Sequence, residues 1–402
     1  MSLADPTLTA RSQPAKDHSV AASAAIRDPR LDFFRGIAMF IILIAHVPGN
    51  WLALWIPARF GFSDATEIFV FCSGMASAIA FGKVFAQRGW GLGAARVAFR
   101  CWQVYWAHIG LFLAIAMTMA ALNASGAFER DYVGQLNLYP FFNNPEQNLI
   151  GLMTLTYVPN YFDILPMYLV ILAMMPAFVA LVWVHRGLAA LVVITIWAFA
   201  QADILYFPAE PWSAREWFFN PFGWQLIFFT GFALMSGWLP APPVDRRLVV
   251  LALVIVLGTV PFAHFRLIGA WDYAQLWRAQ YDLLIAKTDF GLLRYVHFLA
   301  LAYLAWVAVG ARGARLIPSE TGGALAALWR RSLAVIMKVG QQSLAVFITS
   351  MYLARLMGAV LDVTGRNHLS MLLVNLLGAL VLVAVAYGAG WFKSQPWRKA
   401  KG

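Results

Sequence analysis

Apolar runs long enough to cross a bilayer alternate with short polar segments along most of the chain. A transmembrane helix needs about 20 predominantly apolar residues. Ten runs meet this requirement, at residues 31–48, 66–86, 97–122, 163–184, 187–207, 221–239, 247–266, 291–311, 337–361 and 369–392. The pattern therefore predicts an all-α polytopic membrane protein with about ten transmembrane helices. Two connecting stretches, 213–220 and 324–332, mix aromatic or leucine side chains with arginine, which is typical of interfacial helices.

The composition excludes a soluble globular domain. Of the 402 residues, 61% are hydrophobic and only 12% are charged, whereas soluble domains carry roughly 25% charged residues. Residues 1–26 are rich in Ala, Ser and Thr, so we expect a disordered tail there, a membrane domain at 27–392 and a basic tail at 393–402. Cys72 and Cys101 both lie inside apolar runs, which argues against a structural disulfide.

The charge distribution predicts the orientation of the helices. If the N-terminus is cytoplasmic, the cytoplasmic segments together with Arg35 carry 21 Lys/Arg and 6 Asp/Glu, and the opposite side carries 9 and 13. This asymmetry agrees with the positive-inside rule, so both termini are expected in the cytoplasm. Topology thereby explains the basic charge, and no arginine-rich motif with interleaved aromatics indicates a nucleic-acid partner.

The first predicted span carries three ionisable side chains on one face. At a helical 100° per residue, Arg35 and His46 point within about 20° of each other, and Asp32 lies about 60° from Arg35. Ionisable groups inside a span are costly and normally face a bundle interior or a wet cavity, so they indicate function. A neutral His46 imidazole could act as a general base if a carboxylate or carbonyl held its other nitrogen.

Asp64 and Glu67 are the carboxylates closest to His46 in the sequence. Glu67 shares a helix face with Phe71 and Gly74, where the small residue would let another helix or a ligand approach. Two roles for Glu67 follow from this position: it orients His46, or it is a hydrated group at the membrane interface.

The entry of the third predicted span is basic. Arg96, Arg100 and Gln103 follow one stripe of this helix. Paired guanidinium groups match the geometry of phosphate, so one interpretation is a phosphorylated ligand arriving from the cytoplasm. The other is that the arginines simply extend to the membrane surface. His108 lies about 12 Å deeper than Arg100 and is a candidate to line a cavity. The candidate donor-binding residues are therefore Asp32, Arg35, Arg96, Arg100, Gln103 and His108.

Further polar side chains gather on the side predicted to be extracytoplasmic. Arg294 and His297 are neighbours on one helix, where they either recognise an anion, such as an acyl carboxylate or the acceptor, or anchor the helix at the interface. Asn220, Trp224 and Gln225 lie at the start of another span and are candidates to contact the acceptor or the acyl carboxylate. The long loops on this side are rich in aromatics, which form either an interfacial belt or a stacking surface for sugar rings.

Several reaction classes are poorly supported. The sequence has no P-loop, no zinc-spaced Cys/His cluster and no GxSxG elbow. We therefore expect no metal site, no bound cofactor and no ATP hydrolysis. The sequence does not specify an oligomeric state.

Six blocks of sequence, in the same order along the chain, resemble the OpgC-type proteins, which are succinyltransferases of osmoregulated periplasmic glucans. The resemblance extends over about residues 27 to 392. The first block also reproduces the Arg-ten residues-His pattern of the large acyltransferase-3 family. The blocks are RLDFFRGIAMFIILIAH, DATEIFVFCSGMASA, YFDILPMYLVIL, FNPFGWQLIFFTG, KTDFGLLRYVHFLA and GQQSLAVF.

The resemblance implies transfer of a succinyl group from cytoplasmic succinyl-CoA, as co-substrate, to hydroxyls of a periplasmic glucan. It also implies a multi-pass protein of the bacterial inner membrane. His46 would be the essential histidine and Arg35 its paired arginine, and Arg96 and Arg100 would hold the phosphates of CoA. The alternatives are O-acetylation of another extracytoplasmic glycan, or a glycan or lipid transporter without chemistry.

Overall fold

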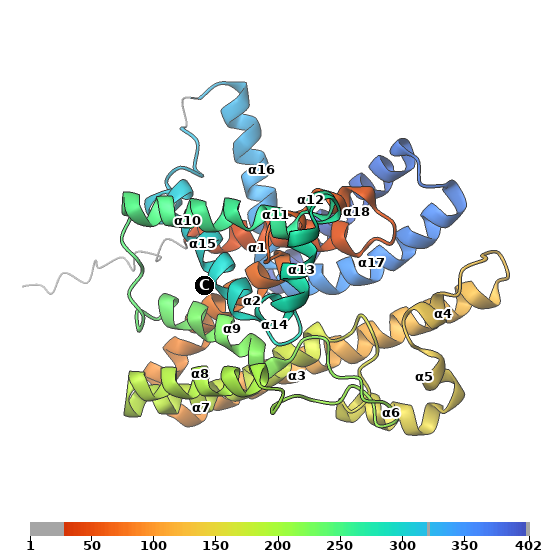
Figure 1. The fold of residues 1–402 in the computed structure, drawn as a ribbon, viewed down its shortest axis with the longest axis horizontal. Helices are drawn as coiled ribbons and strands as arrows, with labels where there is room; N and C mark the ends of the chain where they lie inside the picture. Colours follow the sequence, from red (N-terminus) through yellow and green to blue (C-terminus); the bar gives the residue numbers. More distant parts are fainter. Residues whose placement is uncertain (1–27, 320–321, 399–402) are drawn as a thin grey trace, which may run out of the picture.

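The structure, a computed structural model, describes residues 28–319 and 322–398. Helices make up most of these segments, and the β-pairing among the described residues is one isolated antiparallel bridge between Pro208 and Glu216. The predicted all-α class is therefore confirmed (Figure 1). The tail predicted at residues 1–26 lies outside the described residues.

Six helical segments within the described residues are long and apolar enough to cross a membrane, so the chain is a membrane protein. They are Ala65–Ala124, Ile164–Val184, Arg246–Ala263, Leu292–Val309, Ser343–Thr364 and His368–Ser394. Two shorter apolar helices are α8 (Arg186–Gln201) and α9 (Pro221–Met235). Helix α1 (Pro29–His46) has 18 residues and is apolar apart from Arg30, Asp32, Arg35 and His46. Ten spans, with both termini in the cytoplasm, stay a prediction.

Two helix boundaries differ from the prediction. The second and third predicted spans form one helical run, α2 (Ala65–Ser77), a π-helical turn at Ala78–Gly82 and α3 (Lys83–Ala124). Gly89 bends α3 with φ of 82°, a conformation that glycine adopts without a steric penalty. The predicted span 337–361 is divided at Gln342 into α16 (Ala324–Gln341) and α17 (Ser343–Thr364).

The two predicted interfacial helices are not separate elements. Residues 324–332 form the first half of α16, and residues 213–220 contain bends and no helix. Hydropathy along the chain does not reveal where helices join or divide, because a single irregular turn barely changes the local hydropathy. The basic tail predicted at 393–402 begins later, because α18 (His368–Ser394) includes Lys393.

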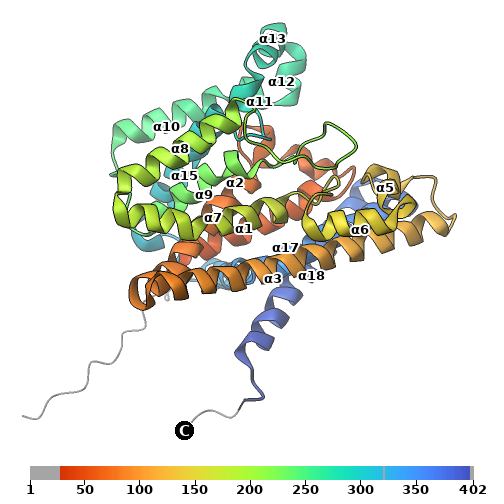
Figure 2. The ribbon, with the colours of Figure 1, turned by 90° about the horizontal axis from the view of Figure 1, so that it is seen from below.

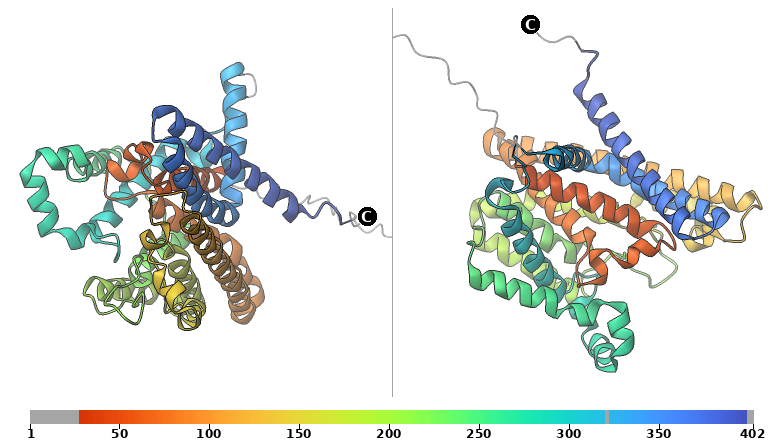
Figure 3. Two further views of the ribbon diagram at one scale, coloured as in Figure 1. Left: turned by 90° about the vertical axis from the view of Figure 1, so that its right-hand side faces the viewer. Right: turned by 90° about the horizontal axis from the view of Figure 1, so that it is seen from above.

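Helix α1 lies at the centre of the bundle, packed against α2, α16 and α17 (Figures 1 and 3). Glycines allow the closest approaches. A Cβ atom at Gly340 of α16 would collide with the backbone carbonyl of Asp32, and one at Gly36 of α1 would collide with the carbonyl of Ile336. Close backbone contact of this kind is how helices associate in a membrane, where the hydrophobic effect between helices is absent.

Helices α2 and α9 pack in the same way. A Cβ atom at Gly74 would meet the carbonyl of Phe228, and one at Gly231 would meet the carbonyl of Phe71. The expectation that Gly74 admits a neighbouring helix is confirmed. These contacts fix α2 between α1 and α9, so the start of α2 faces the end of α1.

The remaining helices surround this centre. Helix α7 (Ile164–Val184) lies along α3, and α10 (Arg246–Gly258) lies along α15 (Leu292–Val309). Short helices α4 (Tyr132–Gln135), α5 (Tyr139–Asn143) and α6 (Pro145–Thr154) follow the C-terminal end of α3, while α11 to α13 project from the bundle (Figure 2). Four short helices connect α10 to α15: α11 (Val260–Ala263), α12 (Phe265–Ala270), α13 (Asp272–Gln280) and α14 (Asp282–Ile285).

Candidate active site

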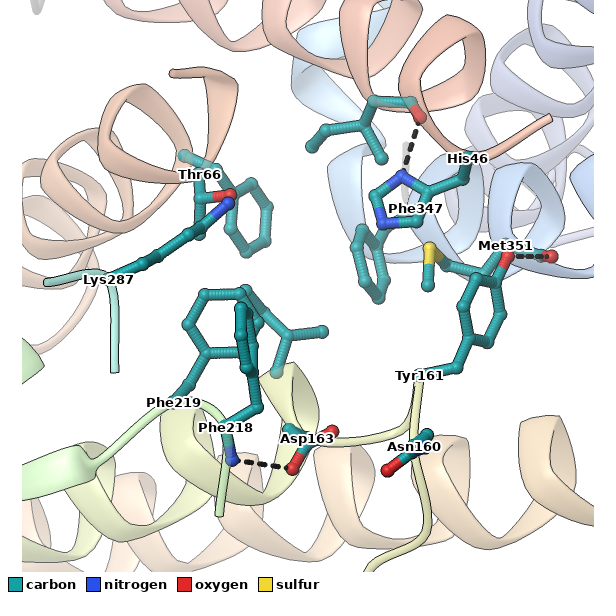
Figure 4. Close-up of a pocket in the computed structure, with 13 residues that line it drawn as sticks. His46, Thr66, Asn160, Tyr161, Asp163, Phe218, Phe219, Lys287, Phe347 and Met351 are labelled. Carbon is teal, nitrogen blue, oxygen red and sulfur yellow. Dashed lines mark hydrogen bonds between the residues drawn. The ribbon is translucent and has the colours of Figure 1, made fainter. Parts of the chain in front are cut away.

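Two cavities lie near the two ends of α1. We call the first the His46 cavity; it has a volume of about 310 Å³, and its polar lining comes from His46, Thr66, Asn160, Tyr161, Asp163 and Lys287 (Figure 4). The second is the Arg35 cavity, of about 430 Å³, and its polar lining comes from Asp28, Arg35, Ser73, Ser77, Arg96, Arg100, Gln103 and Tyr168. Helices α1, α2 and α7 contribute to both cavities.

The His46 ring has a defined hydrogen-bonding state. Its Nδ1 atom lies 2.7 Å from the backbone oxygen of Ile42, one turn earlier in α1. A carbonyl oxygen only accepts, so Nδ1 carries the hydrogen and Nε2 keeps its lone pair. The Tyr161 ring packs edge-on against the imidazole at 5.5 Å and holds its orientation. The sequence left open which group holds the second nitrogen, and this carbonyl occupies that position.

Asp64 and Glu67 do not contact His46 by any hydrogen bond or ion pair of the described residues. Asp64 caps α2 by accepting a hydrogen bond from the Thr66 amide at 2.6 Å, and the Glu67 carboxylate accepts one from the Asp64 amide at 2.7 Å. The predicted role of Glu67 in orienting His46 is therefore replaced by a capping box. The pattern Asp-Ala-Thr-Glu before an apolar run is itself a signature of this cap.

Arg294 pairs with Glu67 and does not line the His46 cavity. Its Nε and Nη2 atoms donate to Glu67 Oε1 at 2.8 and 2.5 Å, in a region where the Glu67 side chain is 0% exposed. His297 also lies outside the cavity lining, with Nδ1 2.8 Å from the Ser63 hydroxyl. The anion that Arg294 meets is thus a carboxylate of the protein itself.

Lys287 is one of the cavity residues that sequence reasoning missed. Its ammonium donates to Asp64 Oδ2 at 2.6 Å, and its side chain is 29% exposed. Figure 4 shows Lys287 and His46 on opposite sides of the cavity. The sequence drew attention to Arg294 and His297, in the helix that follows the Lys287 loop. No spacing along the loop indicates where the lysine points.

Three residues predicted to contact the acceptor instead position this loop or its neighbours. Trp224 Nε1 donates to the Lys287 carbonyl at 2.9 Å, and the Asn220 amide donates to Asp289 Oδ1 at 2.9 Å. Gln225 Nε2 donates to the Val193 carbonyl at 2.8 Å, which ties α9 to α8. All three are buried and lie outside the His46 cavity lining, so they act on the site through the backbone they hold.

Asp163 and Asn160 supply polar groups on the α7 side of the His46 cavity. Asp163, which precedes the first residue of α7, is 3% exposed and accepts a hydrogen bond from the Phe218 amide at 2.9 Å. Burial raises the pKa of Asp163 to about 6, because the charged carboxylate is poorly solvated there. The residue belongs to the YFD sequence that carried the resemblance, but its spacing gave no sign of the cavity.

Replacing Asp163 with asparagine should stabilise the folded protein at pH 7 and have little effect near pH 4. Between about pH 4 and 6 the folded state holds a proton that the unfolded chain has released, so the stability contribution of Asp163 falls as pH rises. The asparagine side chain removes this loss, while its amide oxygen still accepts from Phe218. Thermal unfolding in detergent should show a gain on the order of 2 kcal/mol at pH 7. A gain that is equal at both pH values would contradict this explanation.

The Arg35 cavity brings together residues from α1 and α3 that the sequence placed in separate motifs. Arg35 donates to the Ser343 hydroxyl, and Arg100 Nη1 donates to Gln103 Oε1 at 3.1 Å. Arg96 and Arg100 lie on one lining stripe, with their side chains partly exposed. Among the described residues, this gives three guanidinium groups around one opening, a suitable arrangement for phosphate.

Two residues predicted to contact the donor lie outside this cavity. Asp32 is 0% exposed and accepts a hydrogen bond from Gln341 at 3.2 Å, because α16 packs directly against this turn of α1. His108 is also 0% exposed and lines neither cavity. Lys393, which the sequence analysis assigned to the tail, donates a hydrogen bond to Gln342 at 2.6 Å. Its positive charge lies close enough to Arg35 and Arg100 to be repelled by them.

The two cavities are neighbours along the seam between α1, α2 and α7. Phe69 lines the His46 cavity and Tyr168 lines the Arg35 cavity, and their ring centroids are 6.5 Å apart. Phe347 stacks on Phe69 at 5.6 Å. Aromatic rings thus lie between the His46 cavity and the basic cavity around Arg35.

Comparison with known protein families identifies the family of this chain. A family model described as OpgC protein matches residues 27–394 of the chain. The chain belongs to the OpgC family. OpgC membership makes it a glucan-modifying acyltransferase, and the matched segment contains every residue that lines the two cavities. No match was found among curated proteins or among solved structures.

Proposed function

We propose that this OpgC-family protein moves a succinyl group from cytoplasmic succinyl-CoA to a hydroxyl of a periplasmic glucan in the bacterial inner membrane. The positive-inside charge asymmetry predicts that the Arg35 cavity lies on the cytoplasmic side and the His46 cavity on the periplasmic side. The nucleotide of CoA would bind at the Arg35 cavity, and the acyl group would reach the His46 cavity. The rise of α1 from Arg35 to His46 is roughly 16 Å, a span suited to an extended pantetheine arm.

The observation that carries this proposal is the hydrogen bond from His46 Nδ1 to the Ile42 carbonyl, which leaves Nε2 as a base at the wall of a cavity. In the proposed step, Nε2 takes the proton of the glucan hydroxyl while the hydroxyl oxygen attacks the thioester carbonyl carbon. The carbon–sulfur bond then breaks, and the departing CoA thiolate takes the proton back from His46. The products are the glucan ester and free CoA, and no further reactant is needed.

The donor site would use the guanidinium groups of the Arg35 cavity. Arg96 and Arg100 lie where the phosphates of CoA would enter, and Lys393 adds positive charge near the same opening. The acyl end would pass between Phe69 and Tyr168, whose rings lie between the two cavities. Asp163 and Asn160 would accept or donate hydrogen bonds to hydroxyl groups of the acceptor.

The proposal is tested with the purified protein in vesicles, supplied with succinyl-CoA and a periplasmic glucan on opposite sides. Mass spectrometry should show glucan that has gained one or more succinyl groups. Gain of acetyl groups from acetyl-CoA only, or glucan that moves across the membrane unmodified, would contradict succinyl transfer and favour an acetyltransferase or a transporter.

Removing two guanidinium groups from the donor site should weaken binding of acyl-CoA. The double variant Arg96→Gln/Arg100→Gln is expected to raise the KM for succinyl-CoA by about 10-fold or more, because a charge-assisted hydrogen bond contributes about 1.5–3 kcal/mol. The kcat at saturating donor should change little. The control Arg186→Gln/Arg331→Gln removes the same charge from exposed positions outside both cavities. An equal rise in KM for the control would show that net charge alone acts.

A further inference from the structure

Lys287 supplies the positive charge in the lining of the His46 cavity, and Asp163 supplies a carboxylate. Of the described residues that line this cavity, Lys287 is the one with a Lys or Arg side chain, and the walls around it are largely aromatic and aliphatic. Its ammonium lies 5.5 Å from the ring centre of Phe219. In surroundings of low polarity, a fixed positive charge interacts much more strongly with an anion than it does in water.

Arg355 stacks on the Tyr161 ring at 3.8 Å, and Arg294, another cation near this end of the bundle, is already occupied. Its side chain is 10% exposed, and two of its nitrogens donate to the fully buried Glu67 carboxylate. Arg294 also lies outside the cavity lining. An anionic group that enters the His46 cavity therefore meets Lys287 and not Arg294.

Asp64, the present partner of Lys287, has other contacts that would remain. It accepts the Thr66 amide at 2.6 Å, and Arg294 Nη2 lies 3.9 Å from its Oδ2 atom. When Lys287 exchanges the Asp64 carboxylate for another one, Asp64 keeps its capping hydrogen bond and its 3.9 Å contact with Arg294, which it shares with Glu67. The backbone of Lys287 stays fixed during such an exchange, because Trp224 holds its carbonyl.

We propose that Lys287 binds the free carboxylate of the acyl group and thereby selects donors whose acyl chain ends in a carboxylate. This inference rests on the proposed function and adds the residue that reads the acyl group. In this arrangement the thioester carbonyl lies near His46 and the distal carboxylate at Lys287, on the opposite side of the cavity (Figure 4). A neutral acyl group of the same length leaves the Lys287–Asp64 pair intact and gains no ionic contact.

The test compares three donors: succinyl-CoA, the methyl ester of its free carboxylate, which has nearly the same shape without the charge, and acetyl-CoA. For Lys287→Met, kcat/KM with succinyl-CoA should fall about 10- to 100-fold, the range expected for loss of a charge-assisted contact, while the values for the methyl ester and acetyl-CoA stay within about 3-fold. Lys287→Arg should keep most of the succinyl preference, because the positive charge remains. Lys83→Met, at an exposed position outside both cavities, is the matched control.

Two results would overturn the inference while leaving the proposed function standing. One is equal loss with all three donors in a Lys287→Met protein that remains folded by thermal unfolding. The other needs no variant: the unmodified protein uses the methyl ester as well as succinyl-CoA. Failure of the unmodified protein to transfer any acyl group to glucan would overturn the proposed function itself.

Discussion

Replacing His46 with alanine is expected to lower succinyl transfer to glucan by about 100- to 10,000-fold, the usual contribution of a positioned general base. The reason is local: Nδ1 is held by the Ile42 carbonyl, so Nε2 is the free base at the cavity wall. Mass spectrometry of glucan from cells carrying the variant, and initial rates in vesicles, measure the loss. His368→Ala, which removes an exposed imidazole outside the cavity, should keep normal activity.

Added imidazole should restore part of the activity of His46→Ala, because it can occupy the space of the missing ring. Rescue would support direct attack by the glucan hydroxyl with His46 as base. The alternative is a relay in which the acyl group is first bonded to His46, and it predicts a labelled acyl-enzyme when glucan is withheld. Normal succinylation by His46→Ala would contradict both versions.

Replacing Arg294 with methionine is expected to destabilise the protein by about 3–5 kcal/mol, because it leaves the buried Glu67 carboxylate without its partner. Glu67 is 0% exposed and receives two hydrogen bonds from Arg294. The double variant Glu67→Leu/Arg294→Met should recover much of this loss, since apolar pairs of similar volume often replace a buried ion pair without cost. Thermal unfolding in detergent gives the comparison.

The same variants separate a structural role of Arg294 from recognition of the acyl group. In the structural role, Arg294→Met lowers the amount of folded protein and reduces transfer from all donors equally. Full stability of Arg294→Met together with selective loss of succinyl transfer would contradict it. Such a result would support the interpretation, suggested by the sequence, that Arg294 recognises an anion.

The candidate site was predictable where it depends on one helix. Arg35 and His46 share a face because the helical repeat alone fixes their directions, and they line the two cavities at either end of α1. Arg96, Arg100 and Gln103 were grouped for the same reason, and all three line the Arg35 cavity. Helical spacing also placed Gly74 correctly on a contact face.

The prediction failed where a side chain could choose between partners from different helices. Glu67 was considered for His46, nearby in the sequence, but it pairs with Arg294, 227 residues away. Asn220, Trp224 and Gln225 were considered for the acceptor, but they bind backbone carbonyls or the Asp289 side chain. A buried polar group must be paired, and the nearest partner is set by packing.

The sequence by itself determined that this is an all-α membrane protein of the OpgC type, with Arg35 and His46 on one face of the same helix. Apolar run length, helical repeat and the order of the motif blocks carry that information locally. The tertiary structure alone decided that Lys287 enters the His46 cavity and that Arg294 does not. The physical reason for this placement is the close approach of α2 to α9 at Gly74 and Gly231, together with the hydrogen bonds that fasten the Lys287 loop to α9.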